Sequence, residues 1–377
     1  MRGLAIVFAL LALTFQSASA EVRQYFIAAD EIDWDYMPTG KDAMMPGMPL
    51  MGYAKFFATR GPHLIGKVYR KAMYREYTDA TFKHLKPRKP EDAYLGLLGP
   101  IIHAEVGDTI RIVFHNNGTH PYTMHPHGVF YEKASEGSPY DDGVAPADKG
   151  GDSVAPGKTF TYVWQVPTRA GPGPNDPSSI VWLYHSHVNE RRESESGLAG
   201  VIVVTRRGMA RPDGTPKNVD HEFVAFFMIY NENYSWFIDY NAAHFPTDPK
   251  HVVRSESFPK DPMGNLDNLI GTGFASQNFR AAINGYQYGD GPVMRMKKGE
   301  HVRWYLITLG NGFNNHTPHW HGNTVTINGQ RTDVVSLMPA QMVTADMKPD
   351  DPGIWLFHCH VSDHMEAGMV ARYEVLP

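Results

Sequence analysis

Short stretches in which apolar and polar residues alternate recur along this chain. Examples are Thr109–Phe114 (TIRIVF) and Phe160–Trp164 (FTYVW). Alternation with a period of two predicts strands that bury one face. Turn formers separate the runs, since the chain contains 35 glycines and 28 prolines. The pattern therefore predicts an all-β protein.

The same order of motifs occurs twice. The segment 98–128, which ends in HPHG, resembles the segment 291–322, which ends in HWHG. The segment 181–188 (VWLYHSHV) resembles the segment 354–361 (IWLFHCHV). Each half therefore carries one His-x-His pair early and another late. Two Greek-key β-sandwiches are the architecture that suits such halves.

The repeat and the turn-rich segment between its copies predict the domain organisation. We expect a first domain at residues 21–208, a linker at 209–218 and a second domain at 219–377. Residues 1–20 have a positive start, an apolar middle and small residues before Ala20, which is typical of a cleaved export signal. We therefore expect a secreted or periplasmic protein, processed near Ala20. No later segment is apolar for long enough to predict a membrane span.

Composition narrows the function classes. The 377-residue chain has a net charge of -5, which implies no nucleic-acid or anionic-membrane partner. Cys359 is its one cysteine, so an intrachain disulfide is excluded. A thiol in an oxidising compartment needs protection, and metal ligation provides it. A buried, inert thiol is the alternative.

Cys359 lies between His358 and His360 in a segment that predicts a strand. Neighbouring side chains of a strand point to opposite faces, so the thiol and the two imidazoles should serve different sites. His364 and Met369 follow at distances from which a tight loop can return to the thiol. Cysteine, two histidines and a weak methionine form the ligand set of a blue electron-transfer copper.

Four His-x-His pairs make up the second group of candidate ligands. The spacing places both imidazoles of a pair on one face of a strand. Eight imidazoles are enough to hold three copper ions. His316 can join Cys359, His364 and Met369 at the separate blue site. The four pairs are His125/His127, His185/His187, His319/His321 and His358/His360.

These motifs resemble those of the multicopper oxidases, in particular the ceruloplasmin and hephaestin branch. Further segments that resemble this branch are Asp33–Tyr36, Tyr74–Asp79, Leu95–Ile102 and Tyr131–Gly137. The large members have six such domains, so two domains resemble the compact, laccase-like form. The resemblance implies two cupredoxin-like domains. It also implies one-electron oxidation of a reductant at a type 1 copper, coupled to reduction of O2 to water at a trinuclear copper cluster.

The resemblance also implies roles for individual residues and four copper ions per chain. The type 1 copper would be bound by His316, Cys359, His364 and Met369. The type 2 copper would be bound by His125 and His319. The two type 3 coppers would be bound by His127, His185, His187, His321, His358 and His360. Each domain supplies half of the cluster ligands, and compact relatives form rings of three. We therefore expect a homotrimer with the clusters at subunit boundaries.

The first domain departs from the second at the type 1 site. Tyr122, Ser186, Arg191 and Leu198 stand at the positions of the four type 1 ligands. We expect no type 1 copper in the first domain. Cys359 would act as the electron relay. Glu136 matches an acidic position of the branch and is the candidate proton donor, for which Asp141 and Asp142 are alternatives.

Three classes of reductant are compatible with the sequence. Phenols or aromatic amines suit an accessible type 1 copper. For Fe(II), Asp363 matches an acidic position of the branch, but Ser276 and Ala281 replace the glutamate and histidine expected there. For Cu(I), the five methionines of segment 37–51 offer thioethers, which favour that ion but also fill apolar gaps.

Two other function classes are alternatives to an oxygen-reducing oxidase. A copper-containing nitrite reductase would not need all eight cluster imidazoles, so the copper content separates the two. A non-catalytic scaffold is the second alternative. Scaffold relatives of this branch have lost ligands, whereas every ligand position is filled here.

Overall fold

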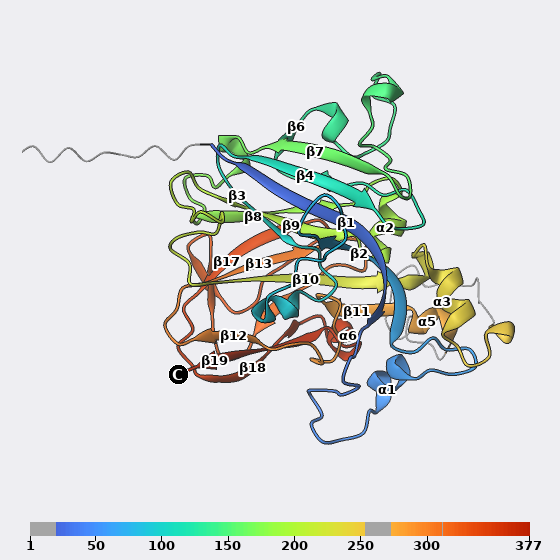
Figure 1. Cartoon of the computed structure of the whole chain (residues 1–377). Helices are drawn as coiled ribbons and strands as arrows, with labels where there is room; N and C mark the ends of the chain where they lie inside the picture. The colour runs from blue at the N-terminus through green and yellow to red at the C-terminus, as the bar shows by residue number, and fades with distance from the viewer. Residues whose placement is uncertain (1–19, 253–272, 311) are drawn as a thin grey trace, which may run out of the picture.

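The computed structural model describes residues 20–252, 273–310 and 312–377. Their strands form four sheets, two from each half of the chain (Figure 1). The two alternating runs lie within β4 (Thr109–Asn116) and β7 (Thr159–Gln165), which confirms both predictions. Within the described ranges, no helix has the length and apolarity required to cross a bilayer.

The first half contains two sheets. One has the strand order β2-β1-β4-β7-β6 and the other β3-β9-β8-β5. Beside β4 and β7, the strands are β1 (Val22–Asp35), β2 (Val68–Glu76), β3 (Ile101–Glu105), β5 (His125–Pro126), β6 (Phe130–Tyr131), β8 (Ser179–His185) and β9 (Ala199–Thr205).

The second half also contains two sheets, with the orders β11-β10-β13-β17-β15-β16 and β12-β19-β18-β14. The strands are β10 (His221–Asn231), β11 (Phe279–Ile283), β12 (Met294–Lys297), β13 (Val302–Thr308), β14 (Pro318–Trp320), β15 (Val325–Ile327), β16 (Gln330–Thr332), β17 (Met342–Met347), β18 (Gly353–Cys359) and β19 (Val370–Leu376).

Helices are short and lie in the connections. They are α1 (Gly52–Ala58), α2 (Glu190–Ser196), α3 (Ile238–His244), α5 (Phe274–Gln277) and α6 (Ser362–Glu366). Short 3-10 helices include η1 (Pro90–Leu95), η4 (Thr168–Ala170) and η5 (Glu232–Tyr234). The predicted all-β fold with two cupredoxin-like sandwiches is confirmed, while the exact domain boundaries stay predictions.

The two halves share one strand topology. β1 runs parallel to β4, as β10 does to β13. β8 lies antiparallel between β9 and β5, as β18 does between β19 and β14. The repeat seen in the sequence is therefore a repeat of structure. Corresponding positions of the two halves can be compared directly.

Apolar side chains join the two halves. Val181 and Leu183 of β8 belong to the same buried cluster as Leu306 of β13 and Ala345 of β17. β8 packs directly against β17, and Figure 1 shows the strands of the first half stacked on those of the second. Burial of this apolar surface stabilises one relative placement of the halves.

Polar contacts cross the same boundary. Ser179 Oγ lies 2.7 Å from the Tyr305 hydroxyl, which donates to Glu222 at 2.6 Å. The second carboxylate oxygen of Glu222 lies 3.2 Å from His103 Nε2. The Arg303 guanidinium donates to Ser179 Oγ at 2.7 Å. Because these groups are buried or half-buried, breaking the contacts would leave polar atoms unpaired, at a cost of about 1–3 kcal/mol each.

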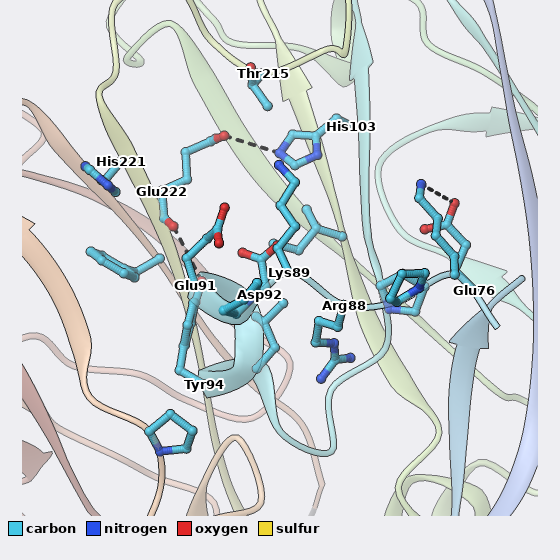
Figure 2. Close-up of a pocket in the computed structure, with 18 of the residues that line it drawn as sticks. Glu76, Arg88, Lys89, Glu91, Asp92, Tyr94, His103, Thr215, His221 and Glu222 are labelled. Carbon is cyan, nitrogen blue, oxygen red and sulfur yellow. Dashed lines mark hydrogen bonds and ion pairs between the residues drawn. The ribbon is translucent and has the colours of Figure 1, made fainter. Parts of the chain in front are cut away.

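A cavity of about 1020 Å³ opens between the halves. Figure 2 shows the His103–Glu222 pair at the wall of this cavity. Glu91 and Asp92 of η1 face the same space, as does Lys89, the residue before η1. None of the twelve predicted copper ligands lines this cavity. The predicted metal chemistry therefore lies elsewhere.

A buried group of charges also joins the halves. The Lys71 ammonium of β2 contacts the Glu232 carboxylate, and both side chains are fully buried. Glu195 of α2 lies beside them and accepts a hydrogen bond of 2.7 Å from the Asn231 backbone N–H. Burial raises the pKa of Glu195 to about 8, against the lowering effects of Asn231 and Lys71.

The predicted export segment at residues 1–20 lies outside the described residues except for Ala20. Export therefore stays a prediction.

Glu195→Gln should make the stability of the protein less dependent on pH. The unfolded chain releases the Glu195 proton above about pH 4.3, whereas the folded chain retains it until about pH 8. The folded state therefore loses stability as the pH rises through this window, by at most about 1.4 kcal/mol per pH unit. The glutamine keeps an oxygen for Asn231 but does not titrate.

Urea unfolding midpoints between pH 5 and 8 should fall less in the variant. Parallel profiles, or an equal effect of Glu91→Gln at an exposed position, would contradict this account.

Candidate metal centre

Three donor atoms meet inside the second half. The Cys359 Sγ lies 3.6 Å from His364 Nδ1 and 3.8 Å from His316 Nδ1, and the two Nδ1 atoms lie 3.2 Å apart. All three side chains are buried. A metal ion with bonds of about 2.0–2.3 Å to imidazole and thiolate needs donors spaced in this range. The geometry and the donor chemistry fit a trigonal copper site.

The surrounding backbone supports this group. Cys359 is the last residue of β18, and its Sγ accepts a hydrogen bond of 3.3 Å from the Thr317 N–H. Asn314 Oδ1 accepts from His316 Nε2 at 3.1 Å and from the Ile229 N–H at 2.7 Å. Asn314 thereby holds His316 with its Nδ1 toward the thiol. Sequence reasoning missed Asn314, because only the folded chain shows this contact.

Met369 is fully buried next to the same site. The Cys359 N–H donates to the Met369 carbonyl at 3.1 Å, and the Met369 N–H donates to the His364 carbonyl at 2.9 Å. The loop through α6 therefore returns to the thiol, as the spacing predicts.

A second group of donors lies on the other side of β18. His319 and His358 face each other across β14 and β18. His321 Nε2 lies 3.0 Å from His358 Nε2. The His360 ring lies 5.2 Å from the His319 ring. The four predicted cluster ligands of the second half therefore form one group, which we call half-site 2.

The first half carries the corresponding group, half-site 1. His125 and His185 face each other across β5 and β8. His127 Nε2 lies 3.1 Å from His185 Nε2, and the His187 ring lies 5.0 Å from the His125 ring. The two half-sites thus repeat the same geometry.

In every pair the strand ends at or just after its first histidine. His127, His187, His321 and His360 all lie one or two residues beyond a strand. The pairs were predicted to lie within single strands, so this detail differs. The rings of each pair nevertheless stay 5.0–5.7 Å apart.

Backbone carbonyls orient four of these imidazoles. A histidine that donates from Nδ1 presents the lone pair of Nε2 to a metal. The Nδ1–carbonyl distances are 2.7 Å for His125 to Glu136, 3.0 Å for His185 to Ser186, 2.9 Å for His319 to Asp333 and 2.8 Å for His358 to Cys359. The Nε2 atoms of each half-site therefore converge as metal donors would.

Burial favours the neutral form of several of these imidazoles. It lowers the pKa of His127 and of His364 to about 4, and holds the pKa of His185 and His316 well below the usual range. Neutral imidazole is the form that binds a metal. Burial raises the pKa of the Cys359 thiol, partly offset by the N–H groups around it. A bound cation would supply the charge that deprotonates the thiol.

The two half-sites do not meet within the described chain. Every ring contact between their histidines joins members of the same half-site. Half-site 2 instead opens into a groove of about 390 Å³, lined by His319, His321, Asp333 and Trp355 among others. His360 is exposed. In half-site 1 the His187 side chain is 34% exposed, so each half-site presents an imidazole to the outside of the chain.

The first half lacks the thiol site at the equivalent position. Ser186 Oγ accepts a hydrogen bond of 2.9 Å from the Thr123 N–H, just as Cys359 Sγ accepts one from Thr317. Tyr122, whose ring is fully buried, stands where the second half has His316. The guanidinium of Arg191 lies 3.4 Å from the Tyr234 ring centroid. These side chains offer no second set of soft donors.

Glu136 lies next to half-site 1. Its backbone carbonyl accepts from His125, while its carboxylate contacts the Lys133 ammonium and accepts from the Tyr140 hydroxyl at 3.0 Å. Asp142 is paired with Lys133 and with Lys149 at 2.9 and 2.8 Å. Among the three candidate proton donors of this loop, Glu136 is the one whose backbone carbonyl accepts a hydrogen bond from a cluster ligand.

The residues considered for metal-ion reductants are dispersed. Ala281 is buried in β11, and Ser276 lies in α5. Asp363 lies in the first turn of α6, next to His364. In the methionine-rich segment, Met37 is fully buried in the core, whereas Met45, Met48 and Met51 are exposed. These positions therefore belong to different elements of the fold.

Family comparisons agree with this geometry. A family model described as multicopper oxidase matches residues 95–208, and a second with the same description matches residues 261–377. Together the matches cover more than half of the chain. Each match includes one half-site, and the second also includes the thiol site.

Curated relatives extend the similarity to nearly the whole chain. Ferroxidase HEPHL1 of Homo sapiens is 40% identical over 96% of this chain. Hephaestin of Rattus norvegicus is 39% identical and ceruloplasmin of Homo sapiens 36% identical, each over 94% of this chain. The chain spans only 29% to 31% of the length of these relatives.

Solved structures share the fold. A multicopper oxidase crystal structure aligns with a TM-score of 0.56 and 21% identity, over 94% of this chain and 89% of that one. A blue copper oxidase from Nitrosomonas europaea aligns with a TM-score of 0.54 and 18% identity, over 94% and 86%. With its fold, its donor groups and both family matches in agreement, the chain belongs to the multicopper oxidase family.

Proposed function

We propose that this chain is an oxygen-reducing multicopper oxidase. It would oxidise a reductant one electron at a time at a type 1 site made of His316, Cys359, His364 and Met369. It would reduce O2 to water at a trinuclear site made from half-sites 1 and 2. Four copper ions per chain fill these positions in the proposal. Bound copper would supply the redox chemistry of both sites.

One observation carries the proposal: a single strand end connects both kinds of site. Cys359 directs its sulfur to His316 and His364, while the neighbouring His358 belongs to half-site 2. The His358 Nδ1 also donates to the Cys359 carbonyl at 2.8 Å. The thiol is therefore joined to an imidazole of the other site both by the peptide bond and by this hydrogen bond.

Proton delivery is assigned to Glu136. Its carboxylate lies in a chain of exchangeable groups that includes Tyr140 and Lys133, and its carbonyl holds His125. A proton held there is close to the place where oxygen would be reduced. Asp141 and Asp142 are the alternatives at the same loop.

Assembly is part of the proposed function, because half-sites 1 and 2 lie apart in the chain. Apolar packing of β8 on β17 and the buried Lys71–Glu232 pair hold the two halves in place. Bringing the half-sites together inside one chain would disrupt these contacts. We propose that half-site 1 of one chain meets half-site 2 of the next, in a homotrimer like the compact two-domain oxidases that the sequence resembles. Such a head-to-tail contact closes into a ring when the rotation between neighbouring chains fits.

An exported location, in the periplasm or outside the cell, belongs to the same proposal. A lone thiol would be at risk of oxidation in such a compartment. Cys359 is buried among copper donors, which would protect it.

Phenols and aromatic amines are the proposed reductants, with Fe(II) and Cu(I) as the second candidates. Asp363 beside His364 favours a metal ion, as do the exposed thioethers of Met45, Met48 and Met51. Oxygen uptake with a phenol, Fe(II) and Cu(I) in parallel distinguishes the three classes. Equal rates on all three would leave the two metal ions without support as specific substrates.

Cys359→Ser should abolish both the intense visible absorption of the copper-loaded protein and oxygen uptake with any reductant. The absorption arises from the thiolate bound to copper, and serine offers no comparable donor. Met369→Leu keeps the thiolate, so it should retain the absorption while raising the reduction potential. Absorption spectra, a redox titration and an oxygen electrode measure these changes. Unchanged turnover in Cys359→Ser would refute the proposed electron path.

Asn314→Leu should weaken copper binding at the type 1 site by about 10–100-fold, the usual loss when the partner of a ligating histidine is removed. Asn314→Asp keeps an oxygen for His316 and should retain binding, with a shifted visible band. Asn315→Ala changes the exposed neighbour and should have no effect. Copper titrations followed by absorption measure the three affinities. Equal affinities of Asn314→Leu and the wild type would show that His316 needs no orienting group.

The full copper content should require assembly. Sedimentation and elemental analysis should give a trimer with about four coppers per chain, and monomers produced by dilution should keep only the type 1 copper. A nitrite reductase would hold fewer coppers per chain. A monomer that holds all four would refute the shared cluster.

A further inference from the structure

The loops beside half-sites 1 and 2 pack in the same way. The glycine after each early His-x-His pair has a positive φ, +73° at Gly128 and +72° at Gly322, and packs against a tryptophan ring. The tryptophan is Trp182 in the first half and Trp355 in the second. A side chain at either glycine would collide with that ring. The loops at the edges of the two half-sites therefore have corresponding positions.

A second contact aligns these edges residue by residue. Trp182 Nε1 donates to the Ala170 carbonyl at 2.7 Å, and Trp355 Nε1 donates to the Asp351 carbonyl at 2.9 Å. The residues before these acceptors are Arg169 and Asp350. Corresponding positions at the edges of the two half-sites thus carry opposite charges.

The edge of half-site 1 combines a cation with an exposed aromatic ring. The Arg169 guanidinium lies 5.0 Å from the centroid of the Phe130 ring. Phe130 is 50% exposed and offers apolar area at this edge. It lies next to Tyr131, whose ring contacts His125. We call Phe130 and Arg169 the basic knob.

The edge of half-site 2 is acidic and hollow. The backbone N–H groups of Asp350 and Asp351 lie 3.1 and 3.5 Å from Asn323 Oδ1, and both carboxylates are exposed. Asn323 lines the groove that contains His319 and His321. Asp333, another exposed carboxylate, is itself one of the residues that line the groove. We call this surface the acidic groove.

We propose that the basic knob of one chain docks into the acidic groove of a second copy of the same chain, with Arg169 facing Asp350 and Asp351. This inference rests on the proposed function, in which half-site 1 of one copy completes half-site 2 of another. It adds the side chains that select this pairing. Phe130 supplies apolar area, and the opposite charges set the orientation.

The charges also exclude the wrong pairings. Two first halves placed face to face would bring Arg169 close to its own copy, and two second halves would bring together Asp350 and Asp351 of both copies. Like charges in contact disfavour both arrangements. Because the halves share one fold, their shapes alone would not distinguish like from unlike pairing. The knob and the groove therefore direct assembly toward rings.

Charge reversal tests the inference. Arg169→Asp alone and Asp350→Arg alone should each raise the concentration of half-dissociation by about 10-fold or more. The double variant carries both reversals in every chain, so every contact regains an attractive pair. It should assemble within about 3-fold of the wild type, corresponding to less than about 1 kcal/mol. Lys83→Asp is the control and should assemble normally. Lys83 is exposed and follows β2, at the opposite edge of the sheet from β6 and Phe130.

Sedimentation velocity over a range of concentrations, on the full chain with and without copper, measures all four variants. The wild type should also dissociate more easily at high salt, which screens exposed charges. If the wild type assembles but the single reversals do not weaken it, or the double variant fails to recover, the docking inference is wrong and the shared cluster stands. If the wild type is a monomer with a full set of coppers, the proposed assembly itself fails.

Discussion

The structure depends on the way that successive side chains leave a β-strand. At the end of β18 the Cys359 thiol turns inward to His316 and His364, while His358 turns the other way and faces His319 and His321. Two sites of different donor chemistry therefore lie one residue apart. The buried side excludes water and holds soft donors, and the open side gathers imidazoles at the surface.

The duplicated fold explains how one half could keep a site that the other lacks. Ser186 and Cys359 occupy the same position and accept the same kind of backbone hydrogen bond, so at this position the halves differ by one oxygen for one sulfur. Tyr122, Arg191 and Leu198 replace the other three ligands. The surrounding structure is also the same in both halves, including the packing of Gly128 on Trp182 and of Gly322 on Trp355. Within this shared structure, specialisation requires changes only at the loop ends.

Sequence reasoning identified the donors because they are chemically distinctive and follow strand periodicity. The donors of the Cys359 site gather in one place, and the histidines of each half-site gather in another. The two half-sites themselves do not meet within the described chain. Sequence reasoning could not find Asn314, the carbonyls of Glu136 and Asp333, or the Lys71–Glu232 pair, since those contacts join segments far apart in the chain or depend on loop conformation. It also placed each histidine pair within a strand, whereas the strands end beside the first histidine because the chain turns there to present the second.

The outward direction of the two half-sites has a consequence for mixtures of chains. In the proposed head-to-tail ring every chain would contribute to two clusters, one through its first half and one through its second. A single chain with a damaged half-site therefore spoils one cluster and leaves its intact half available to a neighbour. Two chains defective in opposite halves would regenerate a working centre where their sound halves meet, so inactive mutants of this protein should complement one another when produced together.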